Sequence, residues 1–504
     1  MKHVDNALRK TLFILLGLIS LFWLFWTFKY LFTDNLRSTR YIFLFVTILL
    51  VLLIFFLNKK FKDLLFKTFK FIYGHKYWFI GILFILQVVI SLFAQALAQG
   101  DSAVLYTVGT NIPDTKQTIL KYFSIYPNNF FILIIIKIIN SIVTPKYLIL
   151  SFSILNALLI DSGIILLTSI GKYLKGEKLA QIVFIETFFL IGLQPQFLYF
   201  YTDPITFFFT SLLCFLVVKY TYKKYLIWWF VIGLIFSIAY KIRVPVVIYL
   251  IALIIVVIYQ LVLSPEKIKK RKLVNKTVVL FSGILITIIG INYYAHHQKI
   301  TEYDTKYSRN FMYFIDLGLT DTGANHSQLP TEILIPEKNG KIQTRTQLES
   351  KLNKDIKNRI KNYGILGLIK HQNTKFKYFV QDGTLGWTTE AVLVESNVVK
   401  TKFTESTIGH KIRDIIYVHR PYYPKYAIYM QISWIFVVLG LVLYFKKYKK
   451  VTYTELVFQL VLLGGILFLS LFEAGRSRYL IQFLPAIILL SSIGYFKMNS
   501  SKSS

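Results

Sequence analysis

Seven charged residues lie where long apolar runs end, which is an unusual place for a charged side chain. They are the acids Asp101, Asp203 and Glu473 and the bases Lys241, Arg243, Arg476 and Arg478. Arginine side chains bind phosphate oxygens through two parallel hydrogen bonds, and they offset the charge of a departing phosphate. A nearby carboxylate can take the proton of an attacking hydroxyl group. If these residues meet in space, they could transfer a group from a phosphate carrier to an alcohol.

Each of these positions also has a purely structural interpretation. Asp203 precedes Pro204, so its carboxylate could cap a helix. Lys241 and Arg243 could be anchors that extend towards a membrane interface. Glu473 could form a local ion pair with the two arginines that follow it, and the acid at 101 could be an ordinary loop residue. These alternatives stay open on the sequence.

The charged residues lie at the ends of apolar runs, which have about the length that crosses a bilayer. The chain has 504 residues, of which 55% are hydrophobic, and about twenty apolar residues span the hydrocarbon core. The runs lie at roughly 11–32, 40–57, 77–97, 127–144, 147–170, 180–201, 204–221, 223–240, 244–263, 275–294, 427–446, 452–471 and 479–496. The chain is therefore predicted to be an all-α, polytopic membrane protein. Its net charge of +33 does not indicate nucleic-acid binding, because the bases are gathered between the runs.

The basic clusters give the orientation. They lie at 59–70, 172–178, 219–224, 267–272 and 446–450, and such clusters mark cytoplasmic loops. All five fall on one side only if one run does not cross. The weakest run is 127–144, which opens with Pro127 and carries Lys137 at its middle, so we expect it to be a re-entrant or interfacial helix. About twelve spans remain, both termini are cytoplasmic, and 98–126, 201–203, 241–243, 295–425 and 473–478 lie outside.

Residues 295–425 are predicted to form a small extracytoplasmic α or α/β domain, between a transmembrane module at 1–294 and the C-terminal helices at 426–504. Its clearest element is a helix at about 346–362, in which Leu348, Leu352, Ile356 and Ile360 repeat every four residues. Gly364 follows as a stop signal. The mixed charge of the segment is typical of a water-exposed surface.

The ordered set of outer residues resembles the GT-C superfamily, the polytopic glycosyltransferases that use polyprenyl-phosphate sugars. Protein O-mannosyltransferases and lipid A aminoarabinose transferases are members. The matching segments are the acid that opens the loop 98–126, "YFSIYPNNFFILIIIKII" (122–139), the succession 147–204 that ends in "FYTDP", and "EAGRSRYLIQFLP" (473–485). The resemblance covers 77–294 and 427–496.

This resemblance implies roles for the outer residues. Asp101 is expected to be the catalytic base and Asp203 to correspond to the second acid. The carrier phosphate is expected to bind the four bases Lys241, Arg243, Arg476 and Arg478. The chain departs from the pattern in having one acid rather than an adjacent pair in the first outer loop, so either Asp114 assists or no second acid does.

Further candidates for acceptor binding or support are Tyr106, Asp114, Asp382, Trp387 and Glu473. Asp382 and Trp387 lie in "FVQDGTLGWTTEA" (379–391). A tryptophan stacks well on a sugar face, and a buried structural tryptophan is the alternative. Two acids facing a phosphate could also hold Mg²⁺ or Mn²⁺, although the bases could serve without a metal.

The predicted function is therefore an inverting sugar transferase of a bacterial plasma membrane. Its partners would be a polyprenyl-phosphate or diphosphate sugar donor, membrane lipid, and an extracytoplasmic wall polymer, glycolipid or protein as acceptor. The alternatives are a transporter or flippase of a lipid-linked glycan and a scaffold of an envelope assembly. Asp161 and Glu186 lie inside apolar runs, and such residues need polar partners or line a cavity.

Overall fold

The structure is a computed structural model of the whole chain. It describes residues 2–36, 46–47, 50, 58–97, 99–112, 121–221, 225–263, 267–334, 337–338, 341–386, 393–448, 451–472 and 475–500. The predicted site residues Asp114, Trp387 and Glu473 lie outside these ranges.

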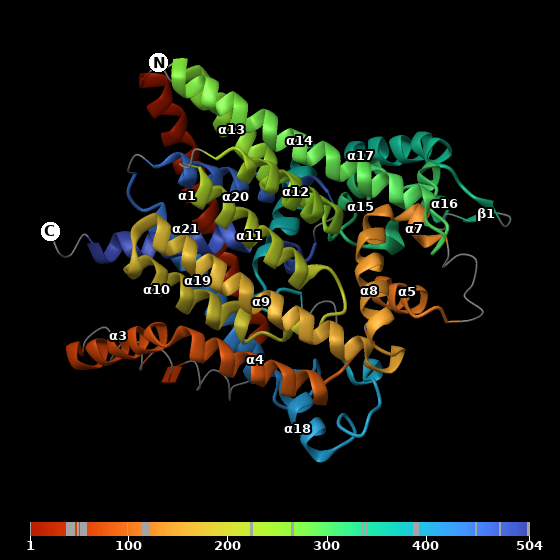
Figure 1. Cartoon of the computed structure of the whole chain (residues 1–504), viewed down its shortest axis with the longest axis horizontal. Coiled ribbons are helices and arrows are strands. Elements are labelled where there is room, and N and C mark those ends of the chain that lie inside the picture. The colour runs from red at the N-terminus through yellow and green to blue at the C-terminus, as the bar shows by residue number, and fades with distance from the viewer. Residues whose placement is uncertain are drawn as a thin grey trace.

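The described chain is helical apart from one short hairpin (Figure 1). The elements of the first half are α1 (Lys2–Tyr30), η1 (Leu31–Asn35), α3 (Lys59–Gly74), α4 (Lys76–Phe93), α5 (Asp101–Gly109), α7 (Tyr122–Ile125), η2 (Pro127–Asn129), α8 (Phe130–Ile142), α9 (Pro145–Lys175), α10 (Glu177–Thr187), η3 (Phe188–Gly192), η4 (Pro195–Leu198), α11 (Asp203–Tyr220) and α12 (Ile227–Ile242).

The elements of the second half are η5 (Val244–Val246), α13 (Val247–Leu263), α14 (Lys267–His297), η6 (Thr305–Tyr307), α15 (Phe311–Gly318), η7 (His326–Gln328), α16 (Thr331–Leu334), β1 (Glu337–Lys338), β2 (Lys341–Ile342), α17 (Arg345–Val380), η8 (Glu395–Asn397), α18 (Thr407–Ile416), α19 (Tyr423–Tyr444), α20 (Tyr453–Leu471), η9 (Ser477–Leu480) and α21 (Leu484–Ser500). The two strands pair antiparallel.

Eight helices of the described chain are long and apolar enough to cross a membrane. They lie in 5–35, 76–93, 145–175, 203–220, 244–262, 270–297, 423–444 and 453–471. Three shorter apolar helices lie in 127–142, 227–242 and 484–498. The polytopic membrane architecture predicted from the apolar runs is thus confirmed. The run 40–57 lies almost wholly outside the described residues.

The run 180–201 is not one continuous helix, which corrects the prediction of a regular span. Helix α10 ends at Thr187 and is followed by the π-turn η3 and the 3₁₀ turn η4. Pro195, at the start of η4, has no N–H and disfavours helical geometry in the residue before it. The chain is therefore irregular just before Asp203.

The run 127–144 forms the short helix α8 after the turn η2, and its location at the outer interface stays a prediction. Helix α8 has 13 residues, which reach only about 20 Å at 1.5 Å per residue. It packs against α5 and α9. Its midpoint lysine, Lys137, donates a hydrogen bond to the side chain of Asn111.

The segment 295–425 contributes to two different cores. Its first half has a small core of its own, formed by Tyr313, Leu317, Leu329, Ile333, Leu348 and Leu352. A capping box at Thr344 and Gln347 starts α17, and the backbone leaves helical geometry at Gly364 as predicted. From Phe376 to Tyr417, however, buried residues of this segment belong to the core of the helix bundle.

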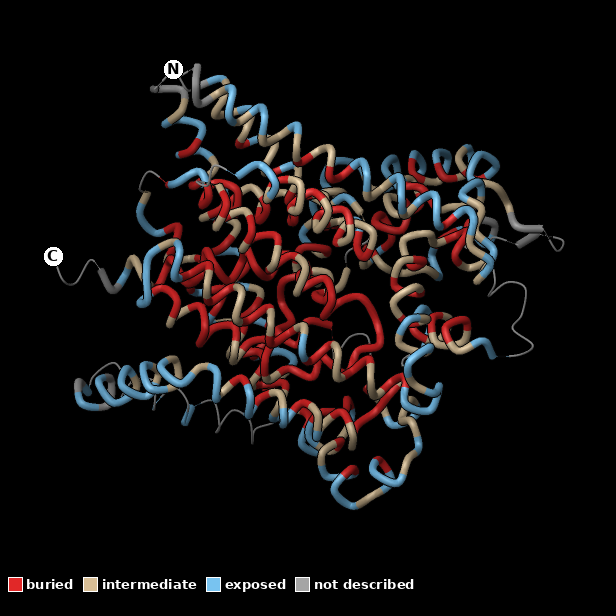
Figure 2. The backbone as a smooth tube through the Cα atoms, in the orientation of Figure 1, coloured by how far each residue is buried: buried red, intermediate tan, exposed pale blue. Residues whose placement is uncertain are grey.

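The buried residues gather at the centre of the bundle, whereas α3 and much of α14 carry exposed residues (Figure 2). The basic cluster 59–70 forms most of α3, and 267–272 forms the first turns of α14. Lysine is a good helix former, and the apolar residues between the lysines of α3 recur at helical spacing. The cytoplasmic location of both clusters stays a prediction.

Candidate functional site

The predicted site contains a buried cluster of one acid and two arginines. Asp203, the first residue of α11, is fully buried. Its Oδ1 accepts a hydrogen bond from Arg243 Nη1 at 2.6 Å. Arg478 Nε lies 3.1 Å from Oδ1 and 3.2 Å from Oδ2 of the same carboxylate. Residues that are 40 and 275 positions from Asp203 in sequence thus meet on one side chain.

Three separate helix ends create this meeting. Pro204 allows α11 to start at Asp203, where the helix dipole favours a negative charge. Arg243 lies in extended backbone directly after α12, and Arg478 lies in the short turn η9. In the structure the carboxylate of Asp203 is engaged by both arginines.

Tyrosine rings surround the two guanidinium groups. Arg478 Cζ lies 4.6 Å from the ring centroid of Tyr199 and 5.0 Å from that of Tyr201. Arg243 Cζ lies 5.3 Å from the ring centroid of Tyr479. Aromatic faces attract cations, and they do so more strongly where water is excluded. Both arginines are therefore held in fixed orientations.

Asp101 lies at the rim of this cluster. It is the first residue of α5 and is exposed. Tyr122 donates a hydrogen bond to its Oδ1 at 2.5 Å, and the Tyr201 hydroxyl lies 3.0 Å from its Oδ2. Asn129 completes a ring of side chains, because its Nδ2 donates to the Tyr122 hydroxyl at 2.5 Å and its Oδ1 lies 2.9 Å from the Tyr201 hydroxyl.

The two tyrosines of this ring remain protonated at neutral pH. Burial raises the pKa of Tyr201 well above its ordinary value, and the negative charge of Asp101 raises it further. The pKa of Tyr122 is also raised, first by burial and then by the neighbouring Tyr201 and Asp101. The Tyr122 hydroxyl therefore donates to the carboxylate, while the single proton of the Tyr201 hydroxyl is shared between Asp101 Oδ2 and Asn129 Oδ1.

Tyr201 joins the two halves of the site. Its hydroxyl contacts Asp101 at 3.0 Å, while its ring lies 5.0 Å from Arg478 Cζ. The exposed acid and the buried arginines are thus separated by a single side chain. Sequence reasoning missed Tyr122, Asn129 and Tyr201, although all three lie in the two segments that were singled out and are polar residues within apolar surroundings.

Short backbone contacts hold the segment that leads to Asp101. The amide of Leu97 donates to the carbonyl of Asn397, and the amide of Val399 donates to that of Gln95, each at 2.9 Å. Residues 95–97 therefore run beside 397–399, which lie far away in sequence. This pairing connects the Asp101 loop to the later part of the 295–425 segment.

A buried loop supports Arg478 from behind. Asp382 accepts hydrogen bonds from the backbone N and the Oγ1 of Thr384 at 2.9 and 2.8 Å, and from Ser477 Oγ at 3.4 Å. Burial raises the pKa of its carboxyl group. Gly386 adopts φ +90°, and a Cβ atom there would lie 2.6 Å from Arg478 Cβ. In these contacts Asp382 fastens two loops together and faces no open surface.

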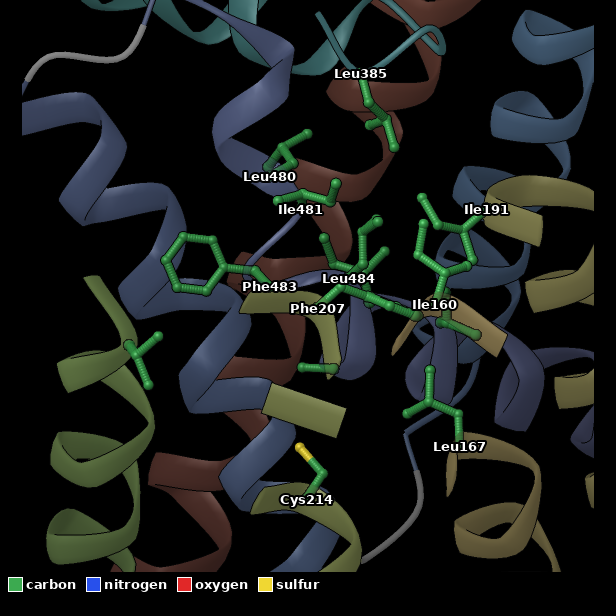
Figure 3. Close-up of a cluster of buried hydrophobic side chains, with 14 of the residues drawn as sticks. Ile160, Leu167, Ile191, Phe207, Cys214, Leu385, Leu480, Ile481, Phe483 and Leu484 are labelled. Carbon is green, nitrogen blue, oxygen red and sulfur yellow. The ribbon is translucent and has the colours of Figure 1, made fainter. Parts of the chain in front are cut away.

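The apolar core continues directly below this loop (Figure 3). Leu385 belongs to the loop that contains Asp382 and Gly386, and Leu480 and Ile481 follow Arg478 in the chain. All three leucine and isoleucine side chains are buried. Phe207, one turn into α11, is fully buried in the same cluster. The polar site therefore has a tightly packed apolar floor.

The remaining predicted residues lie apart from the cluster or make other contacts. Lys241 Nζ donates to Asn292 Oδ1 on α14 at 2.7 Å. Tyr106 packs its ring against Phe200, with centroids 6.2 Å apart, and its hydroxyl lies 3.5 Å from the carbonyl of Pro145. Arg476 is half-buried at the start of η9.

The two acids inside apolar runs have polar partners. Glu186 accepts hydrogen bonds from the hydroxyl groups of Ser491 and Ser492 on α21. Gln87 Nε2 lies 3.3 Å from Asp161 Oδ1. These contacts join neighbouring helices, which agrees with the structural interpretation of both acids.

The described residues do not fit a Mg²⁺ or Mn²⁺ site. No three His, Cys, Asp or Glu side chains gather within the described ranges. Both oxygens of Asp203 face arginine nitrogens, which would repel a divalent cation.

Comparison with known proteins places the chain among membrane proteins. A family model described as a conserved hypothetical integral membrane protein matches residues 1–499. No curated protein matches the chain. Because the match covers almost the whole length, the chain belongs to this family of integral membrane proteins.

Proposed function

We propose that the protein is a membrane glycosyltransferase of the GT-C type, which transfers a sugar from a polyprenyl-phosphate or diphosphate donor to an extracytoplasmic acceptor. The observation that carries the proposal is the contact of Tyr201 with both Asp101 and Arg478. It brings an exposed carboxylate close to buried arginines at the end of apolar helices. A reaction that needs a base and a phosphate site at a membrane surface would use this pair.

In the proposed reaction, Asp101 takes the proton of an acceptor hydroxyl. The hydroxyl oxygen attacks the anomeric carbon, the bond from that carbon to the carrier phosphate breaks, and its electron pair moves to the phosphate oxygen. Tyr122 and Tyr201 hold the carboxylate in position for the attack. A general base of this kind contributes about 10²- to 10⁴-fold to the rate.

Arg478 and Arg243 are assigned to the carrier phosphate in this proposal. Guanidinium groups stabilise the charge that develops on a leaving phosphate. Asp203, which is fully buried between them, is assigned the role of positioning both arginines and not that of a second base. Lys241 and Arg476 are retained as candidates for more distant parts of the carrier.

The proposed topology follows the charge of the loops. We propose a GT-C-like bundle of about twelve spans in a bacterial plasma membrane, with 127–144 at the outer interface. Both termini would be cytoplasmic and 295–425 extracytoplasmic. Labelling of single cysteines introduced at exposed positions tests this arrangement. Labelling of 172–178 from outside would contradict it.

The decisive experiment measures transfer from a radiolabelled polyprenyl-phosphate sugar in membranes that contain the full-length protein. Asp101→Asn is expected to abolish transfer while expression and thermal stability stay unchanged. The matched control is Glu405→Gln, because Glu405 is an exposed acid of the 295–425 segment. Undiminished transfer by Asp101→Asn would refute the assignment. Lipid translocation without transfer by the unaltered protein would favour a flippase.

A further inference from the structure

Helix α3 forms one surface with the turn between α9 and α10. Tyr73, in the last turn of α3, donates a hydrogen bond to Glu177 at the start of α10. The rings of Tyr73 and Phe184 pack with centroids 6.2 Å apart. Phe69 and Ile72 also pack against the bundle core. One face of α3 is therefore fixed to the bundle next to the α9–α10 turn.

The outward face of α3 carries both basic and apolar side chains. Lys60, Leu64, Lys67 and Phe71 follow one another at spacings of four, three and four residues, which places them on one ridge of a helix. All four are exposed, with 58% of Leu64 and 59% of Phe71 accessible. Lysines and large apolar residues thus share a surface that the bundle does not cover.

The α9–α10 turn adds further positive charge to this surface. Lys172, Lys175 and Lys178 are exposed. Glu177 is engaged by Lys172 at 2.6 Å as well as by Tyr73. Two segments about a hundred residues apart in sequence therefore build a single cationic surface.

The position of this surface follows from the helix next to it. Helix α4, a candidate membrane span, begins at Lys76, directly after α3. Its first residues include Tyr77 and Trp78, which are 67% and 75% exposed. Tyrosine and tryptophan concentrate at membrane–water interfaces. The junction between α3 and α4 is therefore expected to lie at the level of the lipid headgroups.

From these contacts we infer that α3 and the α9–α10 turn form a docking surface for anionic phospholipid headgroups. Phe71 and Leu64 insert below the headgroups, while Lys60, Lys67, Lys70 and the lysines of the turn bind lipid phosphates. Basic helices with exposed aromatic residues bind anionic bilayers in this way. The inference does not depend on the proposed transferase activity.

Full-length protein with a fluorescent probe on α3 tests the inference. Cys214 is the only cysteine, so Cys214→Ser with Phe66→Cys gives one site for a polarity-sensitive fluorophore beside the ridge. The protein is reconstituted into phosphatidylcholine vesicles with increasing fractions of phosphatidylglycerol. The probe emission is expected to shift to the blue as that fraction rises, and high salt is expected to reverse the shift.

The triple variant Lys60→Gln, Lys67→Gln and Lys70→Gln separates lipid binding from folding. Each lysine near an anionic surface contributes about fivefold to the binding constant. The variant is therefore expected to bind the anionic surface about a hundredfold more weakly, and its probe emission is expected to shift little as phosphatidylglycerol is added. The control Lys354→Gln, Lys357→Gln and Lys361→Gln removes three lysines from α17 and is expected to respond normally. Equal emission with and without phosphatidylglycerol, or an unchanged response of the α3 variant, would overturn the inference.

Discussion

The hydroxyl of Tyr201 lies 3.0 Å from the carboxylate of Asp101, across one hundred residues of sequence. The same ring faces Arg478, which itself holds Asp203. An exposed acid and a buried ion pair are therefore parts of one connected site. The variants Tyr201→Phe and Asp203→Asn each change one of these parts.

The variant Tyr201→Phe tests the contact with the proposed base. It keeps an aromatic ring at Arg478 but removes the hydrogen bond to Asp101. A hydrogen bond to a charged group contributes about 1.5–3 kcal/mol, so transfer is expected to fall by about 10- to 100-fold. The assay is the transfer of radiolabelled sugar in membranes. Tyr225→Phe is the control, since Tyr225 is 70% exposed. Equal rates for the two variants would remove Tyr201 from the site.

The variant Asp203→Asn tests the buried ion pair. It leaves Arg243 and Arg478 without their shared carboxylate, and removal of one partner of a buried ion pair costs about 3–5 kcal/mol. The free energy of unfolding in detergent is expected to fall by about that amount. The additional change Arg243→Gln is expected to restore part of it, because one uncompensated charge disappears.

A surface ion pair provides the control for that measurement. Asp304 and Lys306 lie 2.6 Å apart, and their side chains are 43% and 58% exposed. Asp304→Asn is therefore expected to cost less than about 1 kcal/mol. If Asp203→Asn costs no more than this control, Asp203 does not hold the two arginines.

The variant Gly386→Ala tests the support behind Arg478. A side chain at φ +90° is strained, and the new Cβ would lie 2.6 Å from Arg478 Cβ. Both Tm and sugar transfer are expected to fall. Gly290→Ala in α14, where a Cβ meets nothing within 4 Å, is expected to keep Tm or to raise it slightly because alanine favours helix. Full activity of Gly386→Ala would show that the loop does not position Arg478.

The stability of the protein is expected to depend on pH through Asp316. This residue is fully buried in α15, and Arg359 Nε lies 3.1 Å from its Oδ1. The pKa of Asp316 is raised from 3.8 to about 7, first by burial and then by the charge of Asp355, while the charge of Arg359 opposes the change. The folded protein thus keeps a proton that the unfolded chain has already released.

The sign of the effect follows from that difference. The contribution of Asp316 is complete below about pH 4 and disappears as the pH rises towards 7 and beyond. Tm in detergent is therefore expected to decrease from pH 5 to pH 8, and Asp316→Asn is expected to reduce this slope. The exposed Asp321 provides the control, because Asp321→Asn is expected to keep it. An unchanged slope in Asp316→Asn would contradict the prediction.

The membrane location of this protein could be predicted from its amino-acid sequence. Apolar runs such as 147–170 and 452–471 are long enough to cross a bilayer, and a backbone in hydrocarbon must satisfy its own hydrogen bonds as a helix. The same rule failed at 180–201, where the regular helix ends before Pro195.

The way in which the charged residues combine depends on the packing of helices that are far apart in sequence. The types and positions of Asp101, Asp203, Arg243 and Arg478 could be selected from the sequence, because charge at the end of an apolar run is costly without a partner. Their pairing could not be derived, since it depends on how α11, α12 and η9 pack together. For the same reason no local pattern distinguished Tyr201, whose role comes from neighbours that are distant in sequence.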